Sequence, residues 1–424
     1  MRSKLSGRRQ ILKDSAALVG VAVGATRSVG GQTRQSGASG EQQALDSDLA
    51  PYGDRSHFVT SERINRCILP SPRSHFCLLT PLQNSVGIIT PSSLHFVLSH
   101  DHHPPDIDPK THHLLIHGMV DRPLTLTMDD LERLPSVSRI HFIECNANSA
   151  TQPMRLAQTA TVQETHGYTS CSEWTGVPLS VLLSQVGVQR SASWIIAEGA
   201  EQSMHFKSIP LLKVMDDVLV AYGQNGEPLR PQQGYPLRLV VPGWEGINNV
   251  KWLRRIKVVD QPYMGMMEST KYPSLRMADG KARWFQFEMG PKSVITRPSG
   301  GQRLPVRGFY QITGLAWSGG GAVRRVEVST DGGATWKDAQ IQGPVHQKAH
   351  TRFRLDWEWN GEEAVLQSRC TDERSEVQPT VAEIARIWRV NVDFFQKTPL
   401  ITGHFNAIQP WRVTREGNVQ NAIF

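Results

Sequence analysis

The sequence of 424 residues has no concentration of charge over most of its length. Its formal net charge is +7, but residues 1–35 hold seven Lys or Arg and one Asp, which leaves the remainder close to neutral. No basic run interleaved with aromatic residues follows, although a protein that binds a phosphate backbone needs such a surface. The sequence therefore argues against a nucleic-acid partner. Its length and its 39% hydrophobic content allow two globular domains, each with its own core.

Long apolar runs are also missing. The run from Ala16 to Ala25 is about half as long as the roughly 20 residues that a helix needs to span a bilayer. It follows Arg8-Arg9 and ends in small residues, which is the pattern of a twin-arginine export signal. We therefore expect residues 1–30 to be such a signal, which directs the chain to the periplasm, and residues 31–53 to be a flexible linker. A cytosolic basic tail is the alternative.

Cysteine is scarce, with five residues, and the Cys-x-x-Cys-His motif that attaches a c-type haem is absent. The sequence therefore predicts no c-type haem in this chain. Because five is an odd number, at least one thiol stays unpaired in an oxidising compartment if the monomer stands alone. Cys67 and Cys77 are near enough in sequence to form a disulfide, and two buried free thiols are equally compatible with their spacing.

Residues 54–285 have the mixed pattern of an α+β domain. Thr127 is placed to cap a helix whose first turn carries acidic residues. Apolar runs predict a leucine-rich helix at 177–186 and strands at 140–143, 194–197 and 237–241. The first of these strands ends at Glu144-Cys145, so Cys145 lies at a strand-to-loop junction, where functional sites are often built.

Residues 286–424 have the pattern of a β-sandwich. Phe353, Leu355, Trp357 and Trp359 alternate with polar residues, as in a half-buried strand. Asp331-Gly332-Gly333 predicts a hairpin turn that leads to a strand with Trp336, because the spaced acids of a calcium loop are lacking. The histidines between His95 and His117 match no closed zinc ligand set, and we expect surface or cofactor-adjacent roles for them.

Cys145 taken alone indicates a buried structural thiol, which is the commoner role of an unpaired cysteine. Its surroundings change that expectation. The chain resembles the sulfite oxidase family of molybdenum-pterin enzymes, and within it the sulfane dehydrogenase subunits of the bacterial thiosulfate-oxidising (Sox) system. The resemblance covers nearly the whole chain from about Leu79 and is carried by motifs in family order, among them Ile88–Pro91, Phe96–His100, Asp106–Pro109, Phe142–Asn148, Ser170–Gly176, Gly234–Arg238, Asn249–Leu253 and Gly314–Gly319.

The resemblance implies roles for individual residues. Cys145 would be the single protein ligand of molybdenum, and a soft thiolate suits a site built mainly of sulfur donors. Trp174 and Tyr272 match positions that line the substrate pocket. The positions that match those holding the molybdopterin and its phosphate are Phe96, His100, Glu201, Gln233, Arg238, Asn249 and Lys251.

Each of these roles has a simpler structural alternative. A guanidinium fork and an ammonium suit a buried phosphate, but Arg238 could instead pair with an acid, and Lys251 could be a solvated surface cation. Trp174 and Tyr272 could be core aromatics.

The chain departs from the family pattern at the position where the Phe-x-Arg motif has its arginine, because Leu98 stands there. Ser149 and Ala150 stand where animal sulfite oxidases have two arginines, and Gln233 replaces a histidine. A less cationic pocket suits a bulkier, less charged substrate than sulfite, such as sulfur carried on the cysteine of another protein. It is equally compatible with lost activity.

The resemblance thus implies an α+β molybdopterin domain, 54–285, followed by an immunoglobulin-like β-sandwich dimerisation domain, 286–424. The implied reaction is oxygen-atom transfer to sulfur at a molybdenum-molybdopterin centre, with electrons leaving to a separate c-type cytochrome. We expect a homodimer, with a sulfur-carrier protein as a possible substrate. The rival functions are a dehydrogenase for free sulfite and a catalytically silent binding subunit.

Overall fold

The computed structural model describes residues 56, 58–65, 77–99, 103–149, 155–201, 205–265, 268–269, 274–276, 282–283, 285, 287–401 and 403–424. Residues 61–424 form one compact unit, and residues 1–60 belong to a second one. The predicted export signal and linker, 1–53, lie outside the described residues, as do His100 and Tyr272. Among the helices that are described, none has the length and apolar character needed to cross a membrane.

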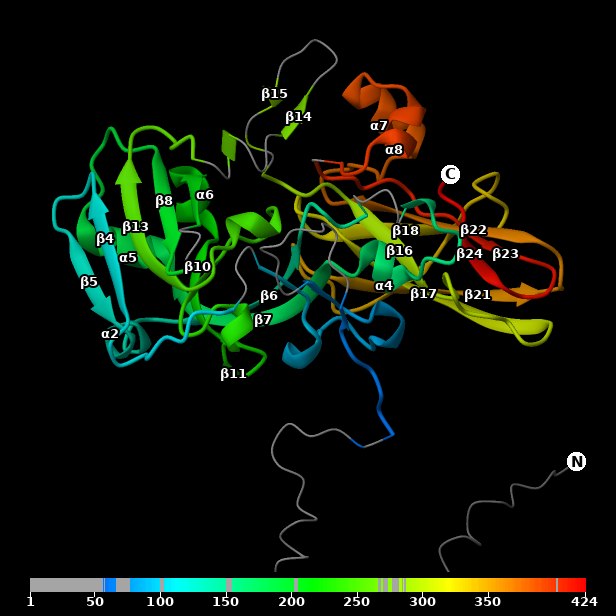
Figure 1. Ribbon diagram of the computed structural model, residues 1–424, viewed down its shortest axis with the longest axis horizontal. Helices are drawn as coiled ribbons and strands as arrows, with labels where there is room; N and C mark the ends of the chain where they lie inside the picture. Colours follow the sequence, from blue (N-terminus) through cyan, green and yellow to red (C-terminus); the bar gives the residue numbers. More distant parts are fainter. Residues whose placement is uncertain are drawn as a thin grey trace, which may run out of the picture. The chain divides into compact units, whose positions relative to one another are not determined.

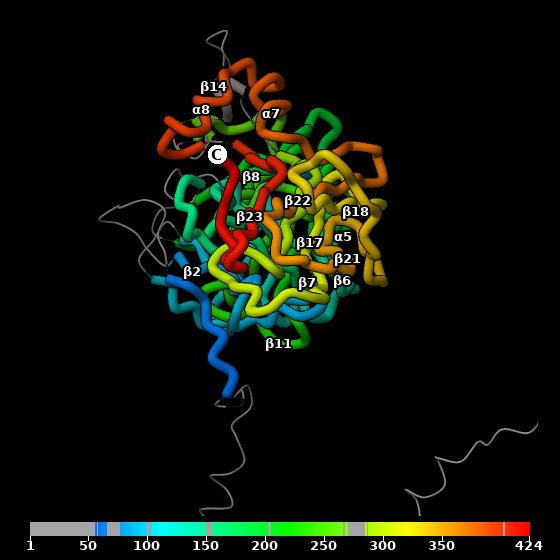
Figure 2. Tube along the Cα trace, turned by 90° about the vertical axis from the view of Figure 1, so that its right-hand side faces the viewer, coloured from blue at the N-terminus to red at the C-terminus, as the bar shows by residue number. Residues whose placement is uncertain are grey.

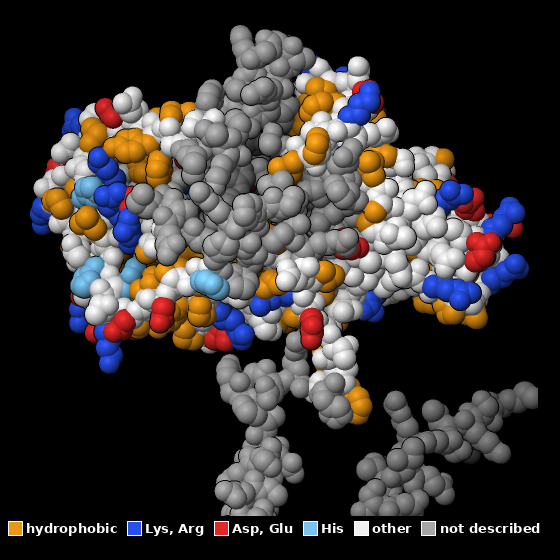
Figure 3. Space-filling model, in the orientation of Figure 1, with side chains coloured by type: hydrophobic (Ala, Val, Ile, Leu, Met, Phe, Trp, Pro, Cys, Tyr) orange, Lys and Arg blue, Asp and Glu red, His pale blue; other side chains and the backbone are white. Residues whose placement is uncertain are grey.

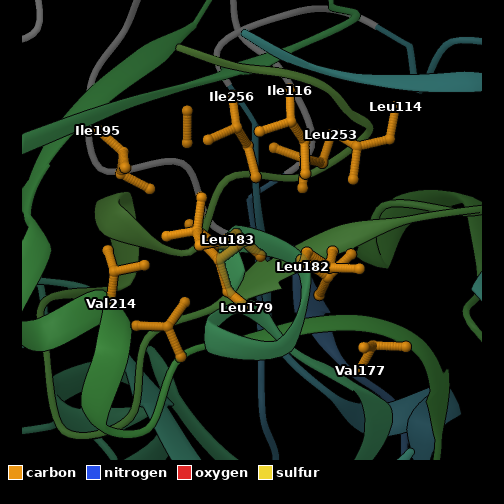
Figure 4. Packing of buried hydrophobic residues seen from close by; sticks show 14 of the residues in the cluster. Leu114, Ile116, Val177, Leu179, Leu182, Leu183, Ile195, Val214, Leu253 and Ile256 are labelled. Carbon is orange, nitrogen blue, oxygen red and sulfur yellow. The ribbon is translucent and has the colours of Figure 1, made fainter. Parts of the chain in front are cut away.

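A mixed five-stranded sheet forms one part of the compact unit (Figure 1). Its central strand, β13, runs parallel to β4 and antiparallel to β8. Apolar side chains from these strands and from the helix α5 (Leu179–Val186) point toward one another and form a dry core (Figure 4). In spatial order the strands are β5 (Leu124–Thr127), β4 (His113–Gly118), β13 (Leu253–Val259), β8 (Trp194–Gly199) and β9 (Phe206–Pro210).

A second sheet carries Cys145 at the end of one strand. Its strand β6 ends at Glu144, so the predicted strand-to-loop junction at Cys145 is confirmed. The last four residues of β6 are buried, which places Cys145 inside the protein and not at the surface. The strands are β11 (Glu227–Pro228), β10 (Leu219–Gln224), β7 (Thr169–Pro178) and β6 (Val137–Glu144), and β12 (Arg238–Val240) also pairs with β10.

A small antiparallel sheet is formed by β1 (Ile64–Asn65), β2 (Cys77–Leu79) and β3 (Val97–Leu98). Cys77 is opposite Leu98 in the register and is disulfide-bonded. Its predicted partner, Cys67, lies outside the described residues.

Short helices connect these sheets. The predicted cap at Thr127 is confirmed: its side chain accepts a hydrogen bond from the Asp130 N–H in a capping box. Thr161 caps a second helix in the same way. The helices are α2 (Met128–Glu132), α4 (Val162–His166) and α6 (Leu211–Asp216), with 3-10 turns at Leu82–Asn84, Ser92–Leu94, Pro231–Gln233 (η3) and Gly246–Asn248 (η4). A separate hairpin pairs β14 (Ser274–Arg276) with β15 (Ala282–Arg283).

The C-terminal part is the predicted β-sandwich, which confirms the α+β fold (Figure 1). Phe353 and Trp359 of β21 are buried and Asp356 and Glu358 are exposed, as the alternation predicts. The turn at 331–333 leads from β18 to β19. One sheet holds β16 (Lys292–Arg297), β17 (Gly308–Trp317), β21 (Thr351–Trp359) and β20 (Gln340–Gln342), and the other β19 (Lys337–Asp338), β18 (Val323–Ser329), β22 (Ala364–Asp372), β23 (Trp411–Val413) and β24 (Val419–Asn421).

Two helices lie beside the sandwich, α7 (Val381–Trp388) and α8 (Val392–Lys397), and Figures 1 and 2 show them next to each other. They enclose a small core of their own around Trp388 and Phe395. The sandwich core itself includes Phe142 of β6 and Cys171 of β7, so buried side chains continue from the sandwich to the strand that precedes Cys145. The domain boundary after residue 285 stays a prediction.

Several predicted boundaries differ from the structure. The strand predicted at 140–143 already begins at Val137, and the strand predicted at 237–241 is confined to Arg238–Val240. The helix predicted from Val177 begins at Leu179, because Val177 is still part of β7 and pairs with Val220, and Pro178 has extended backbone angles. A short apolar run does not by itself distinguish the end of a strand from the start of a helix. Trp336 directly precedes β19 and does not lie on it.

Candidate active site

Cys145 is a free, buried thiol in a tight turn at the end of β6. Its N–H donates to the Tyr168 carbonyl (3.0 Å), and its own carbonyl accepts from the Asn148 N–H (3.0 Å). Burial raises the pKa of the Cys145 thiol to about 12, with a smaller contribution from the carboxylates of Glu245 and Glu144. A thiolate at this position therefore requires a cation beside it, such as a bound metal ion.

One pocket brings together Cys145 and the residues predicted to hold the cofactor. Its walls come from the segment around β3, the loop after β8, η3, β12 and η4. The predicted residues that line it are Phe96, Cys145, Glu201, Gln233, Arg238, Asn249 and Lys251. Side chains of both charges are interspersed with hydrophobic ones on the face drawn in Figure 3, whereas the described lining of the pocket has two cations, Arg238 and Lys251, and one carboxylate.

Arg238 is a buried cation that has no carboxylate partner among the described residues. Its guanidinium donates to the carbonyl of Gln233 (2.9 Å) and to that of Asn249 (3.4 Å). Its Nε atom is buried without a hydrogen-bond partner in the part of the chain that the structure describes. Burial lowers the pKa of Arg238 to about 9. Such a group needs an anion to offset the cost of its burial.

Trp174 lies behind this guanidinium and not in the pocket wall. Its indole ring is fully buried, and the Arg238 guanidinium carbon lies 4.7 Å from the ring centroid. The indole N–H donates to the carbonyl of His141 (3.2 Å). Trp174 thus supports Arg238 by a cation–π contact, and the structure does not bring it to the surface of the pocket as the sequence predicted.

Lys251 and Gln233 hold the wall segment that contains Leu98. The Lys251 ammonium donates to the Leu98 carbonyl (3.2 Å), and the Gln233 amide donates to the Phe96 carbonyl (2.9 Å). Lys251 is therefore part of the site and is not the solvated surface cation that the sequence left open. Glu201 lies 3.9 Å from His205 across the pocket.

Comparisons with known proteins agree with this geometry. Residues 100–267 match the family model described as oxidoreductase molybdopterin binding domain, and residues 283–397 match the Mo-co oxidoreductase dimerisation domain. The crystal structure of the sulfane dehydrogenase SoxCD from Paracoccus pantotrophus is similar, with 40% identity, a TM-score of 0.82, and coverage of 88% of this chain and 94% of that chain. The chain belongs to the sulfite oxidase family of molybdopterin oxidoreductases.

Curated relatives in this family are longer than the aligned region. Mouse mitochondrial sulfite oxidase is 31% identical over 331 residues, which are 72% of this chain and 59% of that protein. Nitrate reductase [NADH] 1 from Arabidopsis thaliana is 34% identical over 303 residues, which are 64% of this chain and 33% of that protein. The chain thus spans between a third and three fifths of these two relatives.

The pocket fits the cofactor of the family, molybdenum held by molybdopterin. Cys145 would supply one thiolate, and Arg238 and Lys251 would offset the charge of the pterin phosphate. In the described part of the chain no three His, Cys, Asp or Glu side chains gather into a metal site, whereas a metal beside Cys145 needs further ligands. A dithiolene pterin provides such ligands.

Two residues of the pocket region add to the predicted set: His95, one of the histidines expected to be at the surface or near the cofactor, and Arg63, for which the sequence indicated no role. His95 lines the pocket, and its Nδ1–H donates to the Phe96 carbonyl (3.0 Å), which leaves Nε2 buried without a partner among the described residues. Burial lowers the pKa of His95 to about 3, so the ring is neutral. Arg63, which precedes β1, donates to the Gln232 side-chain oxygen (2.9 Å), and Gln232 lines the pocket. No local motif identifies Arg63 in the sequence, and only the fold brings it close to the site.

The residues that differ from the family pattern have different surroundings in the structure. Leu98 lines the pocket. Ser149 is buried, with a left-handed backbone (φ 68°), and its hydroxyl donates to the Thr165 carbonyl (3.0 Å). Ala150 lies outside the described residues.

Proposed function

We propose that the chain is a molybdenum-dependent dehydrogenase that oxidises sulfane sulfur bound to another protein. The observation that carries the proposal is the pocket that joins the buried Cys145 thiol to Arg238 and Lys251, with Leu98 in the wall. The similarity to a sulfane dehydrogenase along 88% of the chain supports the same substrate class. A silent binding subunit is disfavoured, because such a protein has no need of a buried cation that no carboxylate of the described residues offsets.

The residues have separate tasks in this proposal. Cys145 binds the metal, and Arg238 and Lys251 bind the pterin phosphate, with Phe96, His100, Glu201, Gln233 and Asn249 around the pterin. When bound, the molybdenum centre supplies oxygen-atom transfer and accepts two electrons. Each oxygen atom added to sulfur comes from water, and two protons and two electrons leave. Trp174 keeps Arg238 in place, and we assign Tyr272 to the substrate pocket.

Leu98 and Arg63 together favour sulfur on a carrier over free sulfite. Free sulfite, as a small dianion, binds best where cations surround it closely. Leu98 places an apolar side chain in the pocket wall, at the position where the family motif has an arginine. Arg63 does not line the pocket and donates to Gln232, which does. This arrangement suits an extended substrate that has its reactive sulfur in the pocket and its remainder near the entrance.

A c-type haem of this chain cannot accept the electrons, because its sequence has no Cys-x-x-Cys-His motif to attach one. We propose a c-type cytochrome subunit as the acceptor, a homodimer formed through the region that matches the dimerisation domain, and export to the periplasm through the twin-arginine signal at residues 1–30. Replacing Arg8-Arg9 by two lysines would then retain the protein in the cytoplasm, which cell fractionation measures.

Metal analysis of exported protein tests the function. Wild type should contain molybdenum and pterin, and Cys145→Ser should lose most of the molybdenum. Cys171→Ser is the matched control, because Cys171 is another free, buried thiol, and burial raises its pKa to about 12 as well. A wild-type protein without molybdenum after expression with molybdate and pterin synthesis, or equal metal content in Cys145→Ser, would refute the enzyme proposal.

The substrate is tested by reduction of cytochrome c. A protein that carries a cysteine persulfide should support reduction at a higher kcat/KM than sulfite does. Leu98→Arg should lower the KM for sulfite several-fold at low ionic strength, and the effect should fade as salt screens the added charge. Efficient turnover of sulfite by wild type would instead favour the free-sulfite dehydrogenase.

A further inference from the structure

A fully buried ion pair lies directly behind Cys145. The side chains of Glu144 and Lys292 are both 0% exposed, and Lys292 Nζ lies 2.9 Å from Glu144 Oε1. Neither residue lines the cofactor pocket. Buried ion pairs add little stability compared with apolar side chains of the same size, because both charges lose their hydration. Stability alone therefore does not account for this pair beside the proposed metal ligand.

The Glu144 carboxylate is the centre of a hydrogen-bond network that includes the Cys145 turn. It accepts from Lys292, from the Asn148 amide (2.9 Å) and from the Trp317 indole N–H (2.7 Å). Asn148 in turn closes the turn by donating its N–H to the Cys145 carbonyl (3.0 Å). Lys292 also donates to the Asn148 carbonyl (3.3 Å). Both ends of the turn that presents Cys145 are thus fixed to one carboxylate.

Two of the three donors come from the C-terminal sandwich. Lys292 begins β16 and Trp317 ends β17, and the two residues are opposite each other in the register. On the other side, η4 approaches the Glu144–Cys145 peptide closely, since a Cβ atom on Gly246 would lie 2.9 Å from the Glu144 carbonyl oxygen. The peptide before Cys145 is therefore held between the sandwich and a wall of the pocket.

We propose that Glu144, Lys292 and Trp317 are positioning residues that fix the orientation of Cys145 toward the metal, so that the C-terminal sandwich is a structural part of the cofactor site. The inference deepens the proposed function and rests on its assignment of Cys145 as the metal ligand. A loosened turn would leave the thiol in place but would let it rotate, which changes the geometry of the bound metal.

The test uses the full chain with its cofactor and separates positioning from stability. The variants are Lys292→Met, Glu144→Gln with Lys292→Met, Lys292→Arg and the mild Trp317→Phe. Glu327→Gln is the matched control, because Glu327 is a buried carboxylate of the sandwich that accepts from Arg369 (2.8 Å). The readouts are molybdenum content, Tm, and the EPR spectrum of the partly reduced molybdenum centre, which reports the geometry of its ligands.

Lys292→Met should lower Tm, because it leaves Glu144 buried without its cation. The double variant should recover much of the Tm lost in Lys292→Met, but it should still have an altered EPR spectrum and several-fold less molybdenum than wild type. Lys292→Arg should keep the spectrum closer to wild type, Trp317→Phe should alter it, and Glu327→Gln should change Tm alone.

A double variant with the wild-type EPR spectrum and molybdenum content would overturn the positioning role. If the double variant does not fold, Trp317→Phe decides instead, and an unchanged EPR spectrum and molybdenum content in that variant would overturn the role. These outcomes differ from failure of the proposed function, in which wild type lacks molybdenum or Cys145→Ser retains it.

Discussion

At the scale of single residues, the chemistry of the site depends on groups that are costly in isolation. Arg238 is the strongest case, since its partners among the described residues are backbone carbonyls, the Gln233 side-chain oxygen and the Trp174 ring. These contacts satisfy part of the guanidinium but do not neutralise it. If the pterin phosphate binds at Arg238 as proposed, it would supply the negative charge that no described residue provides, and this would add to the free energy of binding.

We expect Arg238→Met to reduce the molybdenum and pterin content of the purified protein at least tenfold. A hydrogen bond to a charged group contributes about 1.5–3 kcal/mol, and about 1.4 kcal/mol corresponds to a factor of ten. Arg238→Lys should be intermediate, because one ammonium cannot replace the guanidinium fork. Metal analysis and pterin fluorescence measure both, with Arg254→Met, which removes a half-exposed arginine that pairs with Glu198, as the control. Equal loading of Arg238→Met would exclude a phosphate at this position.

Some residues of the site could be predicted from the sequence and others could not. The grouping of Cys145, Arg238 and Lys251 in one pocket followed from motifs in family order. The network of Glu144 with Lys292 did not, because the two residues are 148 positions apart and no local pattern links them. An arginine such as Arg63 likewise has no sequence feature that distinguishes it from a surface cation.

At the scale of elements, local signals predicted the starts and ends of elements well where a cap or an alternation was present. Thr127 and β21 are examples, and the strand end at Cys145 was predicted from an apolar run. The close approach of η4 to β6 is different in kind. This approach depends on tertiary packing and has no local sequence signal. It is seen in the structure because there is no space for a side chain at Gly246.

Gly246→Ala is therefore expected to disturb Cys145 from the pocket side. The new Cβ would lie 2.9 Å from the Glu144 carbonyl oxygen and 3.3 Å from the Cys145 nitrogen, so the backbone must shift. Overpacking of this kind costs about 1–3 kcal/mol. A lower Tm and reduced molybdenum content are the expected results, whereas Gly343→Ala, which has open space around its Cβ, should behave as wild type. An unperturbed Gly246→Ala would show that η4 moves freely away from β6.

At the scale of the whole molecule, burial keeps several histidines neutral. Burial lowers the pKa of His141 and His404 to about 4 and that of His350 to about 3, and it lowers the pKa of His166 as well. An unfolded chain binds protons at histidine near pH 6.5, so between about pH 6.5 and 4 it binds more protons than the folded chain. The contribution of these histidines to stability is therefore fully present above pH 6.5 and falls as the pH drops toward 4.

His141 offers a direct test, because its side chain is buried and burial lowers its pKa to about 4. In wild type, protonation of His141 in the unfolded state lowers the free energy of unfolding by about 2 kcal/mol at pH 5, given 1.36 kcal/mol for each pKa unit. His141→Phe removes this loss, because phenylalanine binds no proton. Thermal unfolding at pH 7.5 and 5.0 measures it: the Tm of the variant should fall less on acidification than that of wild type. Replacing the exposed His113 by Phe should leave the fall unchanged. If His141→Phe and wild type lose the same Tm, acid unfolding of this protein begins with other groups.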